Sequence, residues 1–197
     1  MNFYYIYKYF RLENGIMIIK YGCVTLRAIE KEDIDLLLYL INAPEIEAMT
    51  VGWHFPISHM DQEQWMNNFK NSAQSIKLMI ELENSKTIGM IMLENIDWKN
   101  RTANLGYKMS ASSVDRMRGD MLDAIKGMLR YAFCELGLEC IHSTILESNI
   151  FSLKLSKRAG FVEEGILRNR IYKNGQYKKL ISVSILKDEF NQGEKKK

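Results

Sequence analysis

The stretch from residue 103 to residue 146 constrains the fold more than any other part of the chain. It holds an apolar run (ANLGYKMS, 103–110), an amphipathic segment (LDAIKGMLRYAFCEL, 122–136) and a second apolar run (CIHSTIL, 140–146). In the middle segment the apolar residues fall on one stripe at helical spacing, and Gly137 stands where a helix C-terminal cap belongs. Because two strands joined through a helix form a crossover connection, we expect the flanking strands to be parallel.

The elements around this unit are typical of antiparallel pairing. SIKLMIEL (75–82) and TIGMIML (87–93) are short apolar runs separated by polar residues, and with the first strand above they predict a three-stranded meander. Farther along, SNIFSLKLSKRAGF (148–161) predicts a helix, and Asn174-Gly175 predicts the turn of a hairpin. The sequence therefore predicts an α+β fold, with a mostly antiparallel twisted sheet, one parallel splayed strand pair and helices on both faces.

The first half of the chain predicts a hairpin and two helices. Residues 3–12 are rich in Tyr and Phe and are followed by an Asn-Gly turn, so we expect a hairpin there; an extension with little order is the alternative. Helices are expected over 30–42 and over 58–70, where the SxxD spacing predicts a capping box. The chain then divides into an N-terminal extension (1–20), a main domain (21–190) and a basic tail (191–197), whose last four residues, Glu194 to Lys197, we expect to be frayed and solvated.

Composition narrows the class of protein. The 197 residues suffice for one domain, and 27 basic against 24 acidic residues are too balanced to indicate a nucleic-acid partner. Three cysteines without CxxC spacing suggest neither a disulfide framework nor a metal site, and a reducing cytoplasm is the natural location. We see no apolar run of the roughly 20 residues that a membrane span needs, and no signal peptide at the start.

The hexapeptide RMRGDM (116–121) lies between a predicted strand end and the strongest predicted helix. Free backbone N–H groups at a helix N-terminus favour an anion, a glycine permits close approach, and arginines add charge-assisted hydrogen bonds. These are the parts of a pyrophosphate site. A solvated loop with ordinary surface charges is the alternative.

A second motif, ESNIFSLKLSKRAGFVEEG (147–165), decides between these interpretations. Together with RMRGDM it resembles the GNAT superfamily of acetyl-CoA-dependent N-acetyltransferases, and the resemblance runs from about residue 24 to residue 190. It is strongest to the branch with ribosomal-protein N-terminal, spermidine and aminosugar acetyltransferases. The resemblance implies acetyl-CoA as co-substrate, no metal, and an amine acceptor.

The resemblance also implies which residues hold acetyl-CoA. The family's phosphate loop falls on 116–121, where Met121 departs from the usual Gly or Ala. The pantetheine arm is expected beside the end of the 103–110 strand, and Asn149 corresponds to the family asparagine that contacts it. The implied cofactor residues are Met109, Ala111, Arg116, Met117, Arg118, Gly119, Asp120, Met121, Asn149, Ser152 and Arg158.

Catalytic roles follow from the same resemblance. Ser152 matches a serine proposed to protonate the leaving thiolate, and Ser156, where many relatives have a tyrosine, is the second candidate. Many relatives have a glutamate base where this chain has Asn104, so Glu94 is the expected substitute, with ordered water as the alternative.

We expect the loop with Trp53, His54 and Phe55 to form an apolar wall with a polar tip at the acceptor site, together with Asp97. His54 is also a further candidate for the general base.

The sequence thus predicts an N-acetyltransferase that acts on a primary amine: a protein N-terminus, a polyamine or an aminosugar. A non-catalytic acyl-CoA-binding module is the alternative, favoured by the missing glutamate and tyrosine. A nucleic-acid binder using Arg116, Arg118, Arg168 and Arg170 is disfavoured because no aromatic residues are interleaved with them. We expect no membrane partner, and a homodimer is a further possibility if the N-terminal segment pairs with a second subunit.

Overall fold

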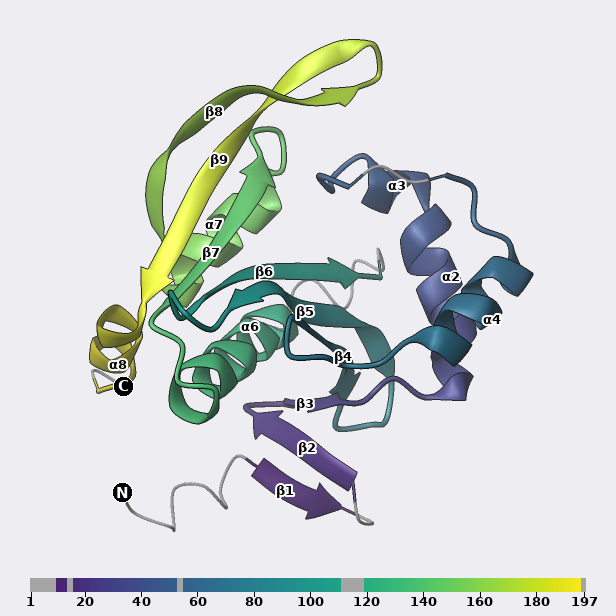
Figure 1. The fold of residues 1–197 in the computed structure, drawn as a ribbon, viewed down its shortest axis with the longest axis horizontal. Coiled ribbons are helices and arrows are strands. Elements are labelled where there is room, and N and C mark those ends of the chain that lie inside the picture. The colour runs from purple at the N-terminus through teal and green to yellow at the C-terminus, as the bar shows by residue number, and fades with distance from the viewer. Residues whose placement is uncertain (1–9, 14–15, 53–54, 111–118, 196–197) are drawn as a thin grey trace.

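A computed structural model describes residues 10–13, 16–52, 55–110 and 119–195. Within these ranges the chain forms a nine-stranded sheet with helices on both faces (Figure 1). Across the sheet the strands lie in the order β1-β2-β3-β4-β5-β6-β7-β9-β8. The strands are β1 (Phe10–Glu13), β2 (Ile16–Tyr21), β3 (Val24–Arg27), β4 (Ser75–Leu82), β5 (Thr87–Asp97), β6 (Thr102–Met109), β7 (Cys140–Leu146), β8 (Val162–Lys173) and β9 (Gln176–Leu186).

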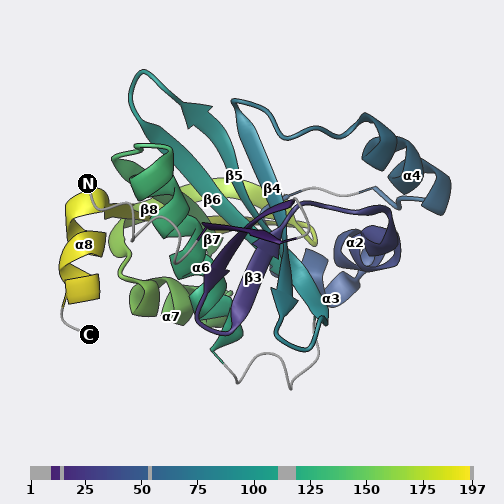
Figure 2. The ribbon, with the colours of Figure 1, turned by 90° about the horizontal axis from the view of Figure 1, so that it is seen from below.

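The helices form two groups on opposite sides of the sheet (Figure 2). One group follows a 3-10 turn, Lys31–Asp33, and comprises α2 (Ile34–Asn42), α3 (Pro44–Glu47) and α4 (His59–Asn68). The other comprises α6 (Asp120–Arg130), which continues as a π-helical turn (Tyr131–Glu135), α7 (Ile150–Ala159) and α8 (Lys187–Lys195). No helix in the described parts of the chain is long and apolar enough to cross a membrane.

The β6–β7 pair confirms the predicted parallel pairing and splay. The two strands pair in parallel only at Thr102↔Cys140, Ala103↔Ile141 and Asn104↔His142; the other ladders of the sheet are antiparallel. Directly beyond the ladder, the Ser143 hydroxyl donates a hydrogen bond of 2.8 Å to the Leu105 carbonyl. The remaining residues of β6 and β7 have no ladder between them, so backbone groups are left available at the divergence.

Two apolar cores hold the helix layers against the sheet. The larger lies between the sheet and α6, where Ile125, Met128 and Leu129 are fully buried. The smaller lies between α2 and the opposite face, where Leu37 and Leu40 pack on methionines of β4 and β5. Because odd and even positions of a strand face opposite sides, the meander supplies side chains to both cores.

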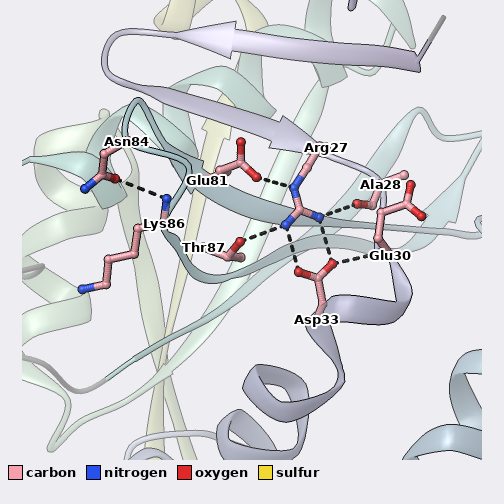
Figure 3. A network of polar contacts seen from close by, with 8 residues as sticks. All are labelled: Arg27, Ala28, Glu30, Asp33, Glu81, Asn84, Lys86 and Thr87. Atoms are coloured by element: carbon pink, nitrogen blue, oxygen red, sulfur yellow. Dashed lines mark hydrogen bonds and ion pairs between the residues drawn. The ribbon is translucent and has the colours of Figure 1, made fainter. Parts of the chain in front are cut away.

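The start of the α2 layer is fixed by the Arg27 guanidinium (Figure 3). It donates two hydrogen bonds of 2.8 Å to the Asp33 carboxylate, one of 2.6 Å to Glu81 and one of 2.8 Å to Thr87. The hydrogen bonds to Asp33, opposed by burial, raise the pKa of Arg27, so the group stays charged. These contacts orient the first helix layer relative to β3, β4 and β5.

The sequence predicts the structure of the N-terminal end of the chain better than that of the C-terminal end. β1 and β2 form an antiparallel hairpin that extends the sheet beyond β3. The sequence predicts a frayed end from Glu194, but α8 continues to Lys195. Phe190 is buried against Phe133, with ring centroids 5.5 Å apart, and the Glu194 carboxylate accepts a hydrogen bond of 2.6 Å from Arg130. An apolar anchor and a buried ion pair therefore order a segment whose composition indicated solvation.

Candidate active site

A cleft of about 800 Å³ opens where β6 and β7 diverge. Its lining comes from segments far apart in the sequence, including residues of both faces of β6. The lining residues are those of α2 to α4 and the following loop (Leu37, Leu40, Ile41, Glu45, Ile46, Met49, Thr50, Val51, Gly52, Ile57, Asp61, Gln62, Trp65), of β4 and β5 (Lys77, Met90, Met92, Glu94), of β6 (104–109), of β7 (143–146) and of the start of α7 (148–152).

Asn149 and Ser152, expected to act together, line this cleft side by side. Asn149 is the N-cap of α7, and its Oδ1 accepts a hydrogen bond of 3.0 Å from the Ser152 amide. The Asn149 Nδ2 donates a hydrogen bond of 2.9 Å to the carbonyl of Met49, in the loop that follows α3. The asparagine therefore joins the two walls of the cleft, and Ser152, 8% exposed, lies just inside it.

The first turn of α6 explains how the chain accommodates its unusual phosphate-loop residues. Gly119 is the N-cap with φ +83°, a conformation that favours glycine. Met121 is buried in the larger core, and Asp120, 2% exposed, accepts a hydrogen bond of 3.0 Å from the Cys23 thiol. Burial, with the carboxylates of Asp120 and Asp123, raises the pKa of Cys23 to about 12, so the thiol remains a donor. Both side chains thus turn inward, away from the loop.

Besides Gly119, Asp120 and Met121, four described residues among those predicted lie outside the cleft lining. The buried Ser156 hydroxyl donates a hydrogen bond of 3.0 Å to the Leu153 carbonyl of its own helix. Arg158 is exposed near the end of α7, and Phe55 is 60% exposed. The Asp97 carboxylate accepts hydrogen bonds from the Asn100 amide and side chain, which lower its pKa and close the β5–β6 turn.

Six predicted residues lie outside the described residues: Trp53, His54, Ala111, Arg116, Met117 and Arg118. The other predicted cofactor residue at the strand end, Met109, lines the cleft.

Glu94 lines the cleft floor on the face covered by α2 to α4. Its half-buried carboxylate forms an ion pair with Lys77 of β4, and it stands opposite Asn104 in the β5–β6 register. Lys108 lines the same floor; burial lowers its pKa, the charge of Lys77 lowers it further, and Glu94 acts in the opposite direction. The candidate base is therefore held in a cluster of two lysines and one carboxylate.

Sequence reasoning missed one polar group of the cleft, Tyr107, and one ion pair outside its lining, Lys173 with Glu47. The Tyr107 hydroxyl is buried, and no described residue meets hydrogen-bond geometry with it. Burial raises its pKa, and the Ser152 hydroxyl lies close enough to oppose that rise. Lys173, near the tip of the β8–β9 hairpin, forms an ion pair with the Glu47 carboxylate. It also donates a hydrogen bond of 2.7 Å to the Glu47 carbonyl. The alternating pattern of β6 marked Tyr107 only as core, and nothing local links residues 47 and 173.

Comparisons with known proteins agree with this geometry. The model of the acetyltransferase (GNAT) domain matches residues 24–162, more than half of the chain. The SPbeta prophage-derived uncharacterized N-acetyltransferase YokL of Bacillus subtilis is 30% identical over 167 residues, covering 85% of this chain and 92% of the relative. The spermidine N(1)-acetyltransferase of Vibrio cholerae is 26% identical over 168 residues, covering 85% and 95%.

Solved structures show the same fold. The crystal structure of spermidine N-acetyltransferase from Vibrio cholerae in complex with CoA and spermine has a TM-score of 0.77 and 25% identity, and covers 85% of this chain and 98% of that one. The splayed β6–β7 pair, the cleft at the divergence and these matches lead to one conclusion. The chain belongs to the GNAT acetyltransferase family and is an acyltransferase.

Proposed function

We propose that this protein transfers the acetyl group of acetyl-CoA to the nitrogen of a primary amine carried on an apolar body. The observation that carries this proposal is a single cleft that joins the β6–β7 divergence, with Asn149 and Ser152, to a largely apolar chamber under α2 to α4. The first part suits the cofactor arm, and the second suits the acceptor.

The residues present fit acetyl-CoA. Beyond Asn104 and His142 the strands lack their mutual ladder, so backbone amides and carbonyls there can pair with the amides of a pantetheine arm. The first turn of α6, with Gly119 as its N-cap and the acidic Asp120 turned inward, leaves backbone N–H groups for phosphate. Arg116 and Arg118 are the proposed charged partners, on sequence grounds.

The chemistry assigns one task to each part of the cleft. The neutral amine attacks the thioester carbonyl, and a backbone N–H near Met109 stabilises the negative charge that develops on the carbonyl oxygen. Glu94, or water held by it, accepts the proton lost by the amine. Ser152, at the N-terminal end of α7, donates toward the sulfur as the carbon–sulfur bond breaks, where the helix dipole also favours negative charge.

The chamber lining favours a protein N-terminus over a polyamine or an aminosugar. Leu40, Ile46 and Met92 represent a mainly aliphatic and thioether surface, which gains from contact with an apolar side chain. The three carboxylates in the described lining already have partners: Glu94 pairs with Lys77, Glu45 accepts from Tyr39 at 2.7 Å, and Asp61 caps α4 through Ser58. A second ammonium group of a polyamine would have to share one of these carboxylates with its present partner.

Free thiol release with a panel of amines tests the function. We expect acetyl-CoA turnover with peptides that begin with an apolar residue, and at least tenfold lower kcat/KM with spermidine or glucosamine. Spermidine as the best acceptor would contradict the acceptor class and leave acetyl transfer standing. Binding of CoA without turnover by any amine would instead support the non-catalytic module.

A further inference from the structure

The Tyr107 hydroxyl is buried, and no described residue meets hydrogen-bond geometry with it, although the Ser152 hydroxyl lies close by. Leaving such a group unpaired is costly, so a buried hydroxyl of this kind calls for a specific reason. Tyr107 also lines the cleft, so part of its side chain borders the space that a bound molecule would fill. A ligand atom that enters beside the ring is therefore a candidate partner for this hydroxyl.

The other orphaned buried atoms in the described residues do not share this property. The second oxygen of Asp120 belongs to a carboxylate already bonded to Cys23, and the Nε of Arg130 belongs to a guanidinium bonded to Glu194. Neither these residues nor Ser75 lines the cleft. Of these buried atoms, only the Tyr107 hydroxyl belongs to a residue that lines the cleft.

Tyr107 lies in the part of β6 where the sulfur of acetyl-CoA is proposed to react. It lies three residues beyond Asn104, the last β6 residue in the ladder with β7, so it belongs to the divergent part of the strand. Ser152 approaches it from α7, while Ser156, at the position where many relatives have a tyrosine, bonds to its own helix and does not line the cleft. A phenol is thus supplied beside Ser152, but from the strand instead of the helix.

We infer that Tyr107 is a catalytic residue whose hydroxyl donates a hydrogen bond to the sulfur of acetyl-CoA as the thiolate leaves, an inference that rests on the proposed function. The nitrogen–carbon bond forms, the carbon–sulfur bond breaks, and its electron pair goes to sulfur. The amine proton goes to the base, and CoA leaves as a thiolate held by Tyr107 and Ser152. No net proton transfer from the phenol is required, and burial keeps the phenol protonated at neutral pH.

Tyr107→Phe removes only the oxygen and keeps the ring that packs on the larger core. We expect kcat to fall about tenfold or more, with KM for acetyl-CoA within about twofold of wild type, because the hydrogen bond strengthens as charge develops. The melting temperature should be unchanged or higher, since no protein hydrogen bond is lost. Tyr177→Phe, at an exposed position on the hairpin outside the cleft lining, is the matched control and should behave as wild type.

A second measurement needs no acceptor. The thiol of bound CoA is titrated by the ultraviolet absorbance of its thiolate, and its pKa in Tyr107→Phe should be at least about one unit higher than in wild type, a tenfold change in the thiolate equilibrium. In the Ser152→Ala background, Tyr107→Phe should still lower kcat.

Each contrary result has a distinct meaning. If CoA binds, yet Tyr107→Phe leaves both kcat and the thiol pKa unchanged, the inference is wrong while the proposed function stands. If the effect of Tyr107→Phe vanishes in the Ser152→Ala background, the phenol only positions Ser152 and is not catalytic. Failure of the wild-type protein to bind CoA would overturn the proposed function, and the inference with it.

Discussion

Glu194 offers the sharpest test of how the C-terminal helix is held. Its carboxylate accepts hydrogen bonds from the Tyr21 hydroxyl at 2.9 Å and from Arg130 at 2.6 Å, and it forms an ion pair with Lys126 at 3.5 Å. Hydrogen bonds to charged groups contribute about 1.5–3 kcal/mol each. Because the carboxylate is 19% exposed, we take the lower part of that range and expect Glu194→Ala to cost about 2–4 kcal/mol of unfolding free energy.

Thermal unfolding converts this cost into a measurable shift. For a domain of this size, 1 kcal/mol corresponds to about 2–4 °C, so Glu194→Ala should lower the melting temperature by roughly 4–16 °C. Glu194→Gln keeps an acceptor oxygen and should show about half that effect. Gln192→Ala, on an exposed position of the same helix, is the control. Equal melting temperatures for Glu194→Ala and Gln192→Ala at pH 7 would refute the reasoning.

The pH dependence adds an independent check on Glu194. Burial alone would raise the pKa of Glu194, but the hydrogen bonds from Tyr21 and Arg130 and the charges of Arg130 and Lys126 outweigh it and lower the pKa below the ordinary value of 4.5. The stabilisation is therefore fully present above pH 4.5 and is lost as the pH falls through the folded-state pKa. The difference between wild type and Glu194→Gln should shrink in acid; a difference that stays constant down to pH 2 would contradict this assignment.

Three further predictions concern the cleft. Ser152→Ala should lower kcat by roughly 10- to 100-fold with little change in KM for acetyl-CoA, as steady-state kinetics will test; an unchanged kcat removes its role as donor. Gly119→Asp places a strained residue and a negative charge at the α6 N-cap, so calorimetry should show at least about tenfold weaker CoA binding, and unchanged affinity would exclude this phosphate site. Lys173→Ala frees the hairpin from Glu47 and should raise KM for the acceptor severalfold without changing CoA affinity; equal losses for both substrates would point to general unfolding.

Local patterns predicted most of the fold. The strands over 75–82 and 140–146 match the structure residue for residue, and the capping box at the start of α4 is present, with Ser58 accepting from the Asp61 amide at 3.1 Å. The predicted hairpin turn at Asn174-Gly175 is present, and both of its residues have positive φ. Each of these features depends on residues that are close together in the sequence, and local sequence patterns predict such features well.

Sequence reasoning did not anticipate burial that no local pattern shows. Met121 departs from the expected loop pattern and Asp120 adds a charge there, yet both side chains are buried, Met121 in the core and Asp120 against Cys23, almost a hundred residues away. Conversely, Ser156 matches a catalytic position but bonds to its own helix. Residue type at a motif position therefore predicts chemistry only when the direction of the side chain is known.

The two halves of the cleft depend on the sequence in different ways. The cofactor half is built by consecutive elements, from β6 through α6 and β7 to the start of α7, so the motifs that mark it are contiguous. The acceptor half requires distant contacts, Asn149 with the Met49 carbonyl and Lys173 with Glu47, that close α3 over the floor. Substitutions in α2 to α4 can therefore reshape the acceptor chamber without touching Asn149, Ser152 or Tyr107. Acceptor choice should consequently differ between relatives that share the cofactor half, and exchange of α2 to α4 between two such relatives should transfer acceptor preference while leaving the affinity for CoA unchanged.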